Sequence, residues 1–214
     1  MPYHPFGPDA NRELPNWIYC GGFALSFLAG YINVSMLYVF AVPVSHMSGA
    51  VSRMGMDLGN GHFADLGLIA AIVLFFALGA IVSGFAIVSN DFTRPYHYRL
   101  ILIAETTLLL LAAMLTPYHQ NAAIALSAMA CGMQNSMASS FNGLIIRTTH
   151  VTGIVTDLGF IIGSYFRTGK LKPWKIILLI LLLLGYLSGG IFSAFIISLM
   201  ISGGYLILIY RDQA

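Results

Sequence analysis

A short polar segment occurs twice in the chain, at residues 46–55 and again at residues 150–159. Each copy begins with a histidine, and a hydroxyl residue and a glycine follow: His46 and Ser48 in the first copy, His150 and Thr152 in the second. A helix that starts after such a hydroxyl presents free backbone N–H groups and the positive end of its dipole, which favour an anion or a carboxylate. Histidine also titrates near neutral pH and could couple binding to a proton. The alternative is that the hydroxyls only cap the helices and the histidines lie at an interface.

The two copies differ at one charged position, where the first has Arg53 and the second has Asp157. Both copies lie between long uncharged runs, and an ionisable group inside a membrane span is by default a functional hypothesis. The two copies belong to two halves of the chain that we interpret below as an inverted repeat. Because such a repeat brings equivalent positions to either side of its axis, we expect Arg53 and Asp157 to form an ion pair near the centre of the molecule. This pair would be either a gate or a structural contact.

Neutral polar residues accompany the two segments. Four of them are further candidates for a solute pathway: Asn33, Gln134, Asn135 and Thr149. Hydrogen bonding between helices is the alternative role, since either partner satisfies a polar group that hydrocarbon cannot. Glu105 lies between one and two helical turns after Arg99, so we expect a solvated carboxylate near the cytoplasmic interface.

The composition indicates that the chain folds in a bilayer. It has 214 residues, of which 58% are hydrophobic and 8% are charged, and its mean hydropathy is +0.83. Soluble domains carry about 25% charged residues. The apolar runs are continuous, and only helices or closed barrels satisfy the backbone in hydrocarbon, so we predict an all-α integral membrane protein.

Several other classes are excluded or disfavoured. The net charge of +2 leaves no basic face for nucleic acid. Cys20 and Cys131 both fall in apolar runs and give neither a metal-binding spacing nor a disulfide framework. No catalytic motif or phosphate-binding loop is present, so we expect no enzyme activity, no metal and no cofactor. The first sixteen residues lack the features of a cleaved signal and are predicted to be a polar cytoplasmic leader.

About six transmembrane helices are expected, together with two re-entrant or broken segments at 45–61 and 148–166. The runs predicted to be spans are 17–44, 66–89, 100–116, 122–146 and 176–210. The last of these is about twice the length that one span needs, so we expect two helices with a turn near Ser202-Gly203-Gly204 or Ser188-Gly189-Gly190.

The chain divides into two related halves, 17–116 and 117–214. Matching residues are Gly30 and Asn33 with Gly132 and Asn135, and Gly79, Ile81, Ser83 and Phe85 with Gly189, Ile191, Ser193 and Phe195. Basic residues are concentrated in the loops 90–99 and 167–175, which we expect to face the cytoplasm. Both loops lie on the same side of the membrane only if each polar segment enters the membrane and returns on the side from which it entered. The two halves are then inverted repeats. Both termini would lie in the cytoplasm.

The sequence resembles the YoaK-type family of bacterial multi-pass membrane proteins, which is defined by a domain of unknown function. The residues that carry the resemblance are Gly30-Tyr31-Ile32-Asn33, Val39-Phe40 and Met47-Ser48-Gly49, and then Gly132-Met133-Gln134-Asn135, residues 148–153 and Thr156-Asp157-Leu158. Where such proteins commonly have Asp, this chain has Asn33, and their Thr-Gly-Asn is here Ser48-Gly49-Ala50. The resemblance implies a multi-pass protein of the bacterial inner membrane.

These features favour a small-solute transporter that works by alternating access, with membrane lipid and an unknown small solute as its partners. A re-entrant-loop channel is the nearest alternative. A non-transporting membrane scaffold or sensor is the alternative from a different class. We also expect a homodimer, in which Gly185, Gly189 and Gly190 supply close helix contacts.

Overall fold

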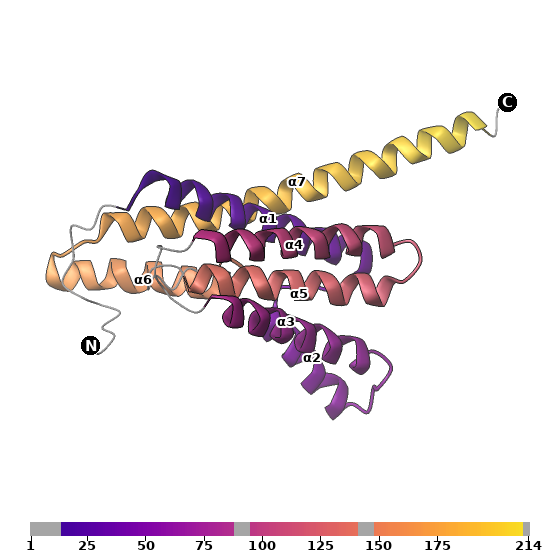
Figure 1. Cartoon of the computed structure of the whole chain (residues 1–214), viewed down its shortest axis with the longest axis horizontal. Helices are drawn as coiled ribbons and strands as arrows, with labels where there is room; N and C mark the ends of the chain where they lie inside the picture. Colours follow the sequence, from indigo (N-terminus) through magenta and orange to yellow (C-terminus); the bar gives the residue numbers. More distant parts are fainter. Residues whose placement is uncertain (1–13, 88–94, 141–147, 212–214) are drawn as a thin grey trace.

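The chain folds into a bundle of α-helices, described here from a computed structural model (Figure 1). The structure describes residues 14–87, 95–140 and 148–211, and for residues 95 and 201–211 it describes the backbone only. Within these ranges there is no β-strand. The helices are α1 (Asn16–Phe40), α2 (Met47–Gly59), α3 (Leu66–Ala86), α4 (Pro95–Leu115), α5 (Gln120–Ser139), α6 (Val151–Thr168) and α7 (Pro173–Arg211).

Four of the helices are long and apolar enough to cross a membrane. They are α1, α3, α4 from Tyr96, and α7 as far as Met200. Large apolar side chains are exposed along them, among them Leu74, Ile103 and Phe195. Exposed apolar surface on this scale suits contact with lipid rather than with water. The prediction of an all-α membrane protein is therefore confirmed, and four helices of the described part qualify as candidate spans where about six were expected.

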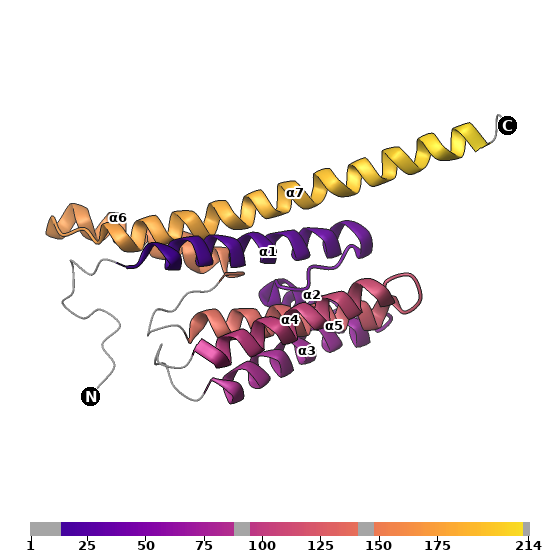
Figure 2. The same ribbon diagram turned by 45° about the horizontal axis from the view of Figure 1, so that its top comes forward.

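The helices α1, α3, α4, α5 and α7 run along the long axis of the molecule (Figures 1 and 2). The shorter helices α2 and α6 extend toward opposite ends of that axis. The most extensive packing joins α1 to α7 and α3 to α5, and α4 covers α5. Each half of the chain therefore packs mainly against the other half, which makes the two halves interdependent.

Helix α5 is the centre of the bundle, which explains its sequence. It packs against α3, α4 and α1. Most of its residues from Ala123 to Ala138 are buried. Small and polar side chains are tolerated there because neighbouring helices, and not lipid, surround them. For the same reason α5 is less apolar than the helices that face the lipid.

Four glycines allow the helices to approach at backbone distance, and they are the glycines that match between the halves. A Cβ atom added to Gly30 would overlap the carbonyl oxygen of Tyr186, three residues before Gly189, and one added to Gly189 would overlap that of Phe27, three residues before Gly30. The second pair repeats this arrangement: Gly132 faces the carbonyl of Phe76, and Gly79 faces that of Met129. The α1–α7 and α3–α5 contacts, each of which joins the two halves, thus have the same geometry.

The prediction that residues 176–210 form two helices is wrong. Helix α7 is continuous for 39 residues, or about 58 Å, which exceeds the thickness of the hydrocarbon core. Gly189 and Gly190 do not form a turn, because they lie inside the helix where α1 packs against it. As a result α1 begins at one end of the molecule and α7 ends at the other (Figure 1), which differs from the expectation that both termini share one side.

Other boundaries differ less. The span predicted at 17–44 ends at Phe40, and the one predicted at 122–146 is described only as far as Ser139 because residues 141–147 lie outside the described part. The glycines proposed for a homodimer contact are occupied within the chain: Gly185 and Gly189 lie on Phe23 and Phe27, and Gly190 on Val34. These glycines are therefore not available to a second copy.

Candidate functional site

The first polar break follows α1. The helix ends at Phe40 because Ala41 adopts a left-handed conformation, with φ 56°, and Pro43 lacks a backbone N–H. The chain then turns back along the helix that it has just left. Asn33 Oδ1 accepts hydrogen bonds from the backbone N–H of Ser45, at 3.2 Å, and from its hydroxyl, at 2.8 Å. Since Asn33 lies seven residues before Phe40, Ser45 has returned by about 10 Å into the bundle.

The second break, after α5, repeats this contact. Asn135 Oδ1 accepts a hydrogen bond from the hydroxyl of Thr149 at 3.2 Å. Thr148 and Thr149 are both buried. Asn135 matches Asn33, and Thr149 precedes His150 as Ser45 precedes His46. Two of the predicted pathway residues, Asn135 and Thr149, are therefore in direct contact, and in both halves an amide anchors the returning chain.

The two breaks converge on one pair of helices. The Ser26 hydroxyl of α1 lies 3.0 Å from the Thr148 carbonyl and 2.7 Å from the Leu182 carbonyl of α7. Ser26 and Asn33 are seven residues apart, so the second and first breaks contact α1 at points about 10 Å from each other. On α7 the Tyr186 side chain is within hydrogen-bonding reach of Ser45. Sequence patterns missed Ser26 and Tyr186, whose only signal was a polar group within an apolar run.

Helices α2 and α6 start at these breaks, directly after His46 and His150. The His150 Nδ1 atom accepts a hydrogen bond from the Gly153 N–H at 2.8 Å and so caps α6. His46 makes no side-chain cap. Ser48 and Thr152, in the first turns, are both exposed. The residues just before these helices, Ser45 and Thr149, are buried, so both helices start at the edge of the bundle, and their free N–H groups and dipoles favour negative charge there.

Gln134 connects the halves in a different place. Its side chain is fully buried, and its Nε2 atom donates a hydrogen bond to the Leu25 carbonyl of α1 at 2.9 Å. Its Oε1 atom has no partner among the described residues. Gln134 thus joins α5 to α1 within the contact between halves, as expected for a helix-bonding residue.

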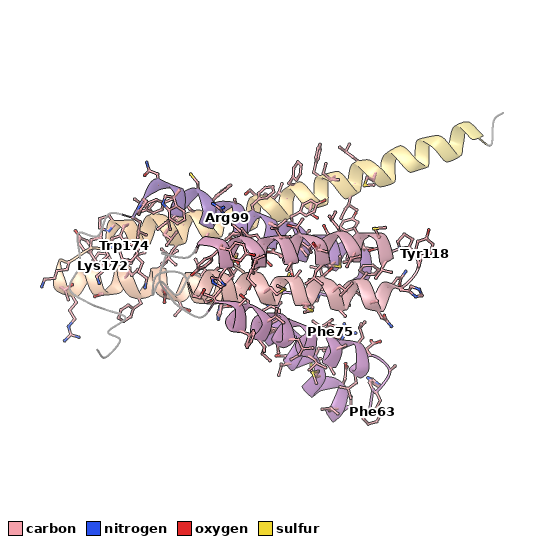
Figure 3. All side chains as sticks on the ribbon, in the orientation of Figure 1. Phe63, Phe75, Arg99, Tyr118, Lys172 and Trp174 are labelled. Carbon is pink, nitrogen blue, oxygen red and sulfur yellow. The ribbon has the colours of Figure 1, made fainter. Side chains whose placement is uncertain are left out.

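The predicted pair between Arg53 and Asp157 is wrong. Arg53 contacts Asp65 at 2.8 Å and Asp57 at 3.8 Å, whereas Asp157 contacts Lys175 at 3.2 Å. Helices α2 and α6 run away from the centre toward opposite ends, so residues two turns along them move apart (Figure 1). Figure 3 shows Phe63, just beyond α2, and Lys172, just beyond α6, at opposite ends of the molecule. Each charge therefore finds a local partner.

Asp157→Asn is expected to change the free energy of unfolding by less than about 1 kcal/mol, because the Asp157 side chain is 51% exposed and solvent weakens its pair with Lys175. Thermal unfolding of the purified protein in detergent measures this. Arg53→Gln, which removes the exposed pair with Asp65 at the other end and the longer contact with Asp57, is the matched control and should have a similarly small effect. A large loss in Asp157→Asn alone would show a buried partner for Asp157.

Glu105 is not at the interface, as the sequence position suggested, but inside the bundle. Its side chain is 2% exposed, and neither carboxylate oxygen has a hydrogen-bond partner among the described residues. The sequence placed Glu105 at the correct distance from Arg99 along the helix. However, Glu105 lies on the side of α4 that packs against α5. The described residues also contain no group of three or more His, Cys, Asp and Glu side chains that could hold a metal ion.

Long apolar helices with two polar breaks held inside the bundle define a multi-pass helical membrane protein. The chain belongs to the family described as "Protein of unknown function (DUF1275)", whose model matches residues 21–210. The resemblance seen in the sequence is thereby confirmed. No curated protein and no solved structure matches the chain.

Proposed function

We propose that this chain is a secondary transporter of a small solute in the bacterial inner membrane. The solute site lies where the two breaks converge on α1 and α7, and the first turns of α2 and α6 line it. The solute that suits this environment is a small molecule with a carboxylate or another anionic group, since two helix N-termini face it.

One observation supports this proposal above the others. Each break is anchored by the same contact, Asn33 with Ser45 and Asn135 with Thr149, and each anchor holds the start of a helix within the bundle. Discontinuous helices that begin near the midplane are the usual means by which secondary transporters bind a solute. A buried Thr148 Oγ1 without a partner among the described residues adds a polar group beside the second break.

We also propose that the halves are inverted repeats, with α1, α2 and α3 equivalent to α5, α6 and α7. The paired amide contacts and the paired glycine contacts support this equivalence. The helix α4 is then the connection between the repeats. Lys170, Lys172 and Lys175 follow α6, so the end of the molecule that α6 approaches is assigned to the cytoplasm by its positive charge.

A solute of this class is expected to raise the thermal unfolding temperature of the purified protein, because a ligand that binds only the folded state stabilises it by mass action. A panel of small carboxylates, amino acids and lipophilic compounds at several pH values provides the screen. Thr152→Val should abolish the shift given by the best compound, since it removes a hydroxyl from the first turn of α6. Uptake of the labelled compound into proteoliposomes then measures transport.

Thr168→Val is the matched control, because Thr168 lies in the last turn of α6, is exposed, and bonds only within that part of the helix and its adjoining turn. It should retain the shift. If no compound stabilises the protein, and if the only effect of Asn33→Ala and of Asn135→Ala is a loss of stability, the polar breaks serve only to hold the bundle together. The chain is then a scaffold.

A further inference from the structure

Glu105 occupies the middle of α4. It lies ten residues after Pro95 and ten before Leu115, with about 15 Å of helix on either side. If α4 crosses the bilayer, this carboxyl group is near the midplane, farther from water than any other Asp or Glu in the described part of the chain. Its burial is nearly complete at 2% exposure.

Among the described residues, no charge in the surroundings of Glu105 balances a carboxylate. α4 packs against α5 and, less extensively, against α3. The only titratable side chain of α5 is Cys131, which is buried and near enough to Glu105 for the two to interact electrostatically, and α3 has none. The titratable residues of α4 itself are Tyr96, His97, Tyr98 and Arg99, in its first two turns. A buried carboxyl group without a partner is stable as the neutral acid and not as the ion.

Helix α5 connects Glu105 with the proposed solute site. α4 packs against α5, and α5 carries Asn135, whose Oδ1 accepts a hydrogen bond from Thr149 at the second break. α4 belongs to neither repeat, whereas α5 begins the second one. A change in charge at Glu105 is therefore placed to alter the packing of the helix on which the second break depends.

We propose that Glu105 is a proton-binding site that couples solute movement to a proton. This inference rests on the proposed transport function. The carboxylate takes a proton from water and becomes a carboxylic acid in one state of the cycle, and it returns the proton to water in another. Protonation removes the buried charge, so the two states of Glu105 favour different arrangements of α4 against α5.

Infrared difference spectroscopy of the reconstituted full chain tests this without a solute. The chain has only two glutamates, Glu13 and Glu105, so labelling with isotopically substituted glutamate restricts the shifted carboxyl bands to these two positions. We expect a protonated-carboxyl band that grows on acidification, is absent in Glu105→Gln and is retained in Glu13→Gln. A Glu105 band of constant intensity from mildly acidic to alkaline pH, or no such band, would show a carboxyl that does not exchange protons with water and would overturn the inference.

A second measurement separates this inference from the proposed function. For the compound that stabilises the protein most, the thermal shift should vary with pH in the wild type and lose that dependence in Glu105→Gln. If Glu105→Gln binds the compound with unchanged pH dependence, transport stands and the role of Glu105 is wrong. Glu105→Gln preserves the shape of the neutral acid, and normal unfolding by heat in the absence of compound verifies that it folds.

Discussion

Gly132→Ala is expected to destabilise the protein by about 3 kcal/mol or more, at the upper end of what overpacking costs. The added Cβ atom would overlap the Phe76 carbonyl oxygen, which is backbone and cannot rotate away, so α3 and α5 would have to separate. This contact belongs to the centre of the bundle, where α5 is buried on most sides. Thermal unfolding in detergent and the yield of monodisperse protein measure the loss.

Three more glycines should behave like Gly132, because each faces a backbone carbonyl at equally close range: Gly30, Gly79 and Gly189. Gly21→Ala in α1 and Gly84→Ala in α3 are the controls. Nothing lies within 4 Å of a Cβ atom at either position, so alanine should be neutral or stabilising by up to about 1 kcal/mol through helix propensity. Equal tolerance of Gly132→Ala and Gly21→Ala would show that α3 and α5 do not approach at backbone distance.

The matching glycine and asparagine positions of the two halves could be predicted from the sequence, because each role requires a particular residue type. Gly30 and Gly132 match since each must expose its backbone, and Asn33 and Asn135 match since each must anchor a returning chain. Hydropathy likewise located the spans, because contact with lipid requires long apolar runs. These signals do not depend on knowing which helices are neighbours.

The remaining features depend on packing between distant segments, and the sequence did not reveal them. Gly189 was interpreted as part of a turn, but its purpose is to admit the backbone of α1 against a continuous helix. The position of Glu105 along its helix was predicted correctly, but its side chain was expected to be solvated and is buried. Contact with α5 decides which side of α4 faces inward. Arg53 and Asp157 are equivalent positions, yet they do not meet because α2 and α6 diverge from the centre.

Cysteines placed at Gly59 and Gly163 are expected to react with a membrane-impermeant maleimide from opposite sides of the membrane. Gly59 ends α2, and Gly163 is its equivalent in the last third of α6. Both helices begin at breaks inside the bundle and run outward toward opposite ends (Figures 1 and 2). Right-side-out and inverted vesicles measure the sidedness. The background is Cys20→Ser, because Cys20 is exposed whereas Cys131 is buried.

Two loop positions calibrate the sides, since Figure 3 shows Tyr118 and Lys172 at opposite ends of the molecule. Gly59→Cys should share its side with Tyr118→Cys, and Gly163→Cys should share the cytoplasmic side with Lys172→Cys, where the basic residues lie. If the second polar segment crossed the membrane completely, α6 would add a fourth crossing to α3, α4 and α5, and Gly163→Cys would react from the same side as Gly59→Cys. Such a result would exclude the inverted arrangement, in which three helices cross the membrane between these two positions.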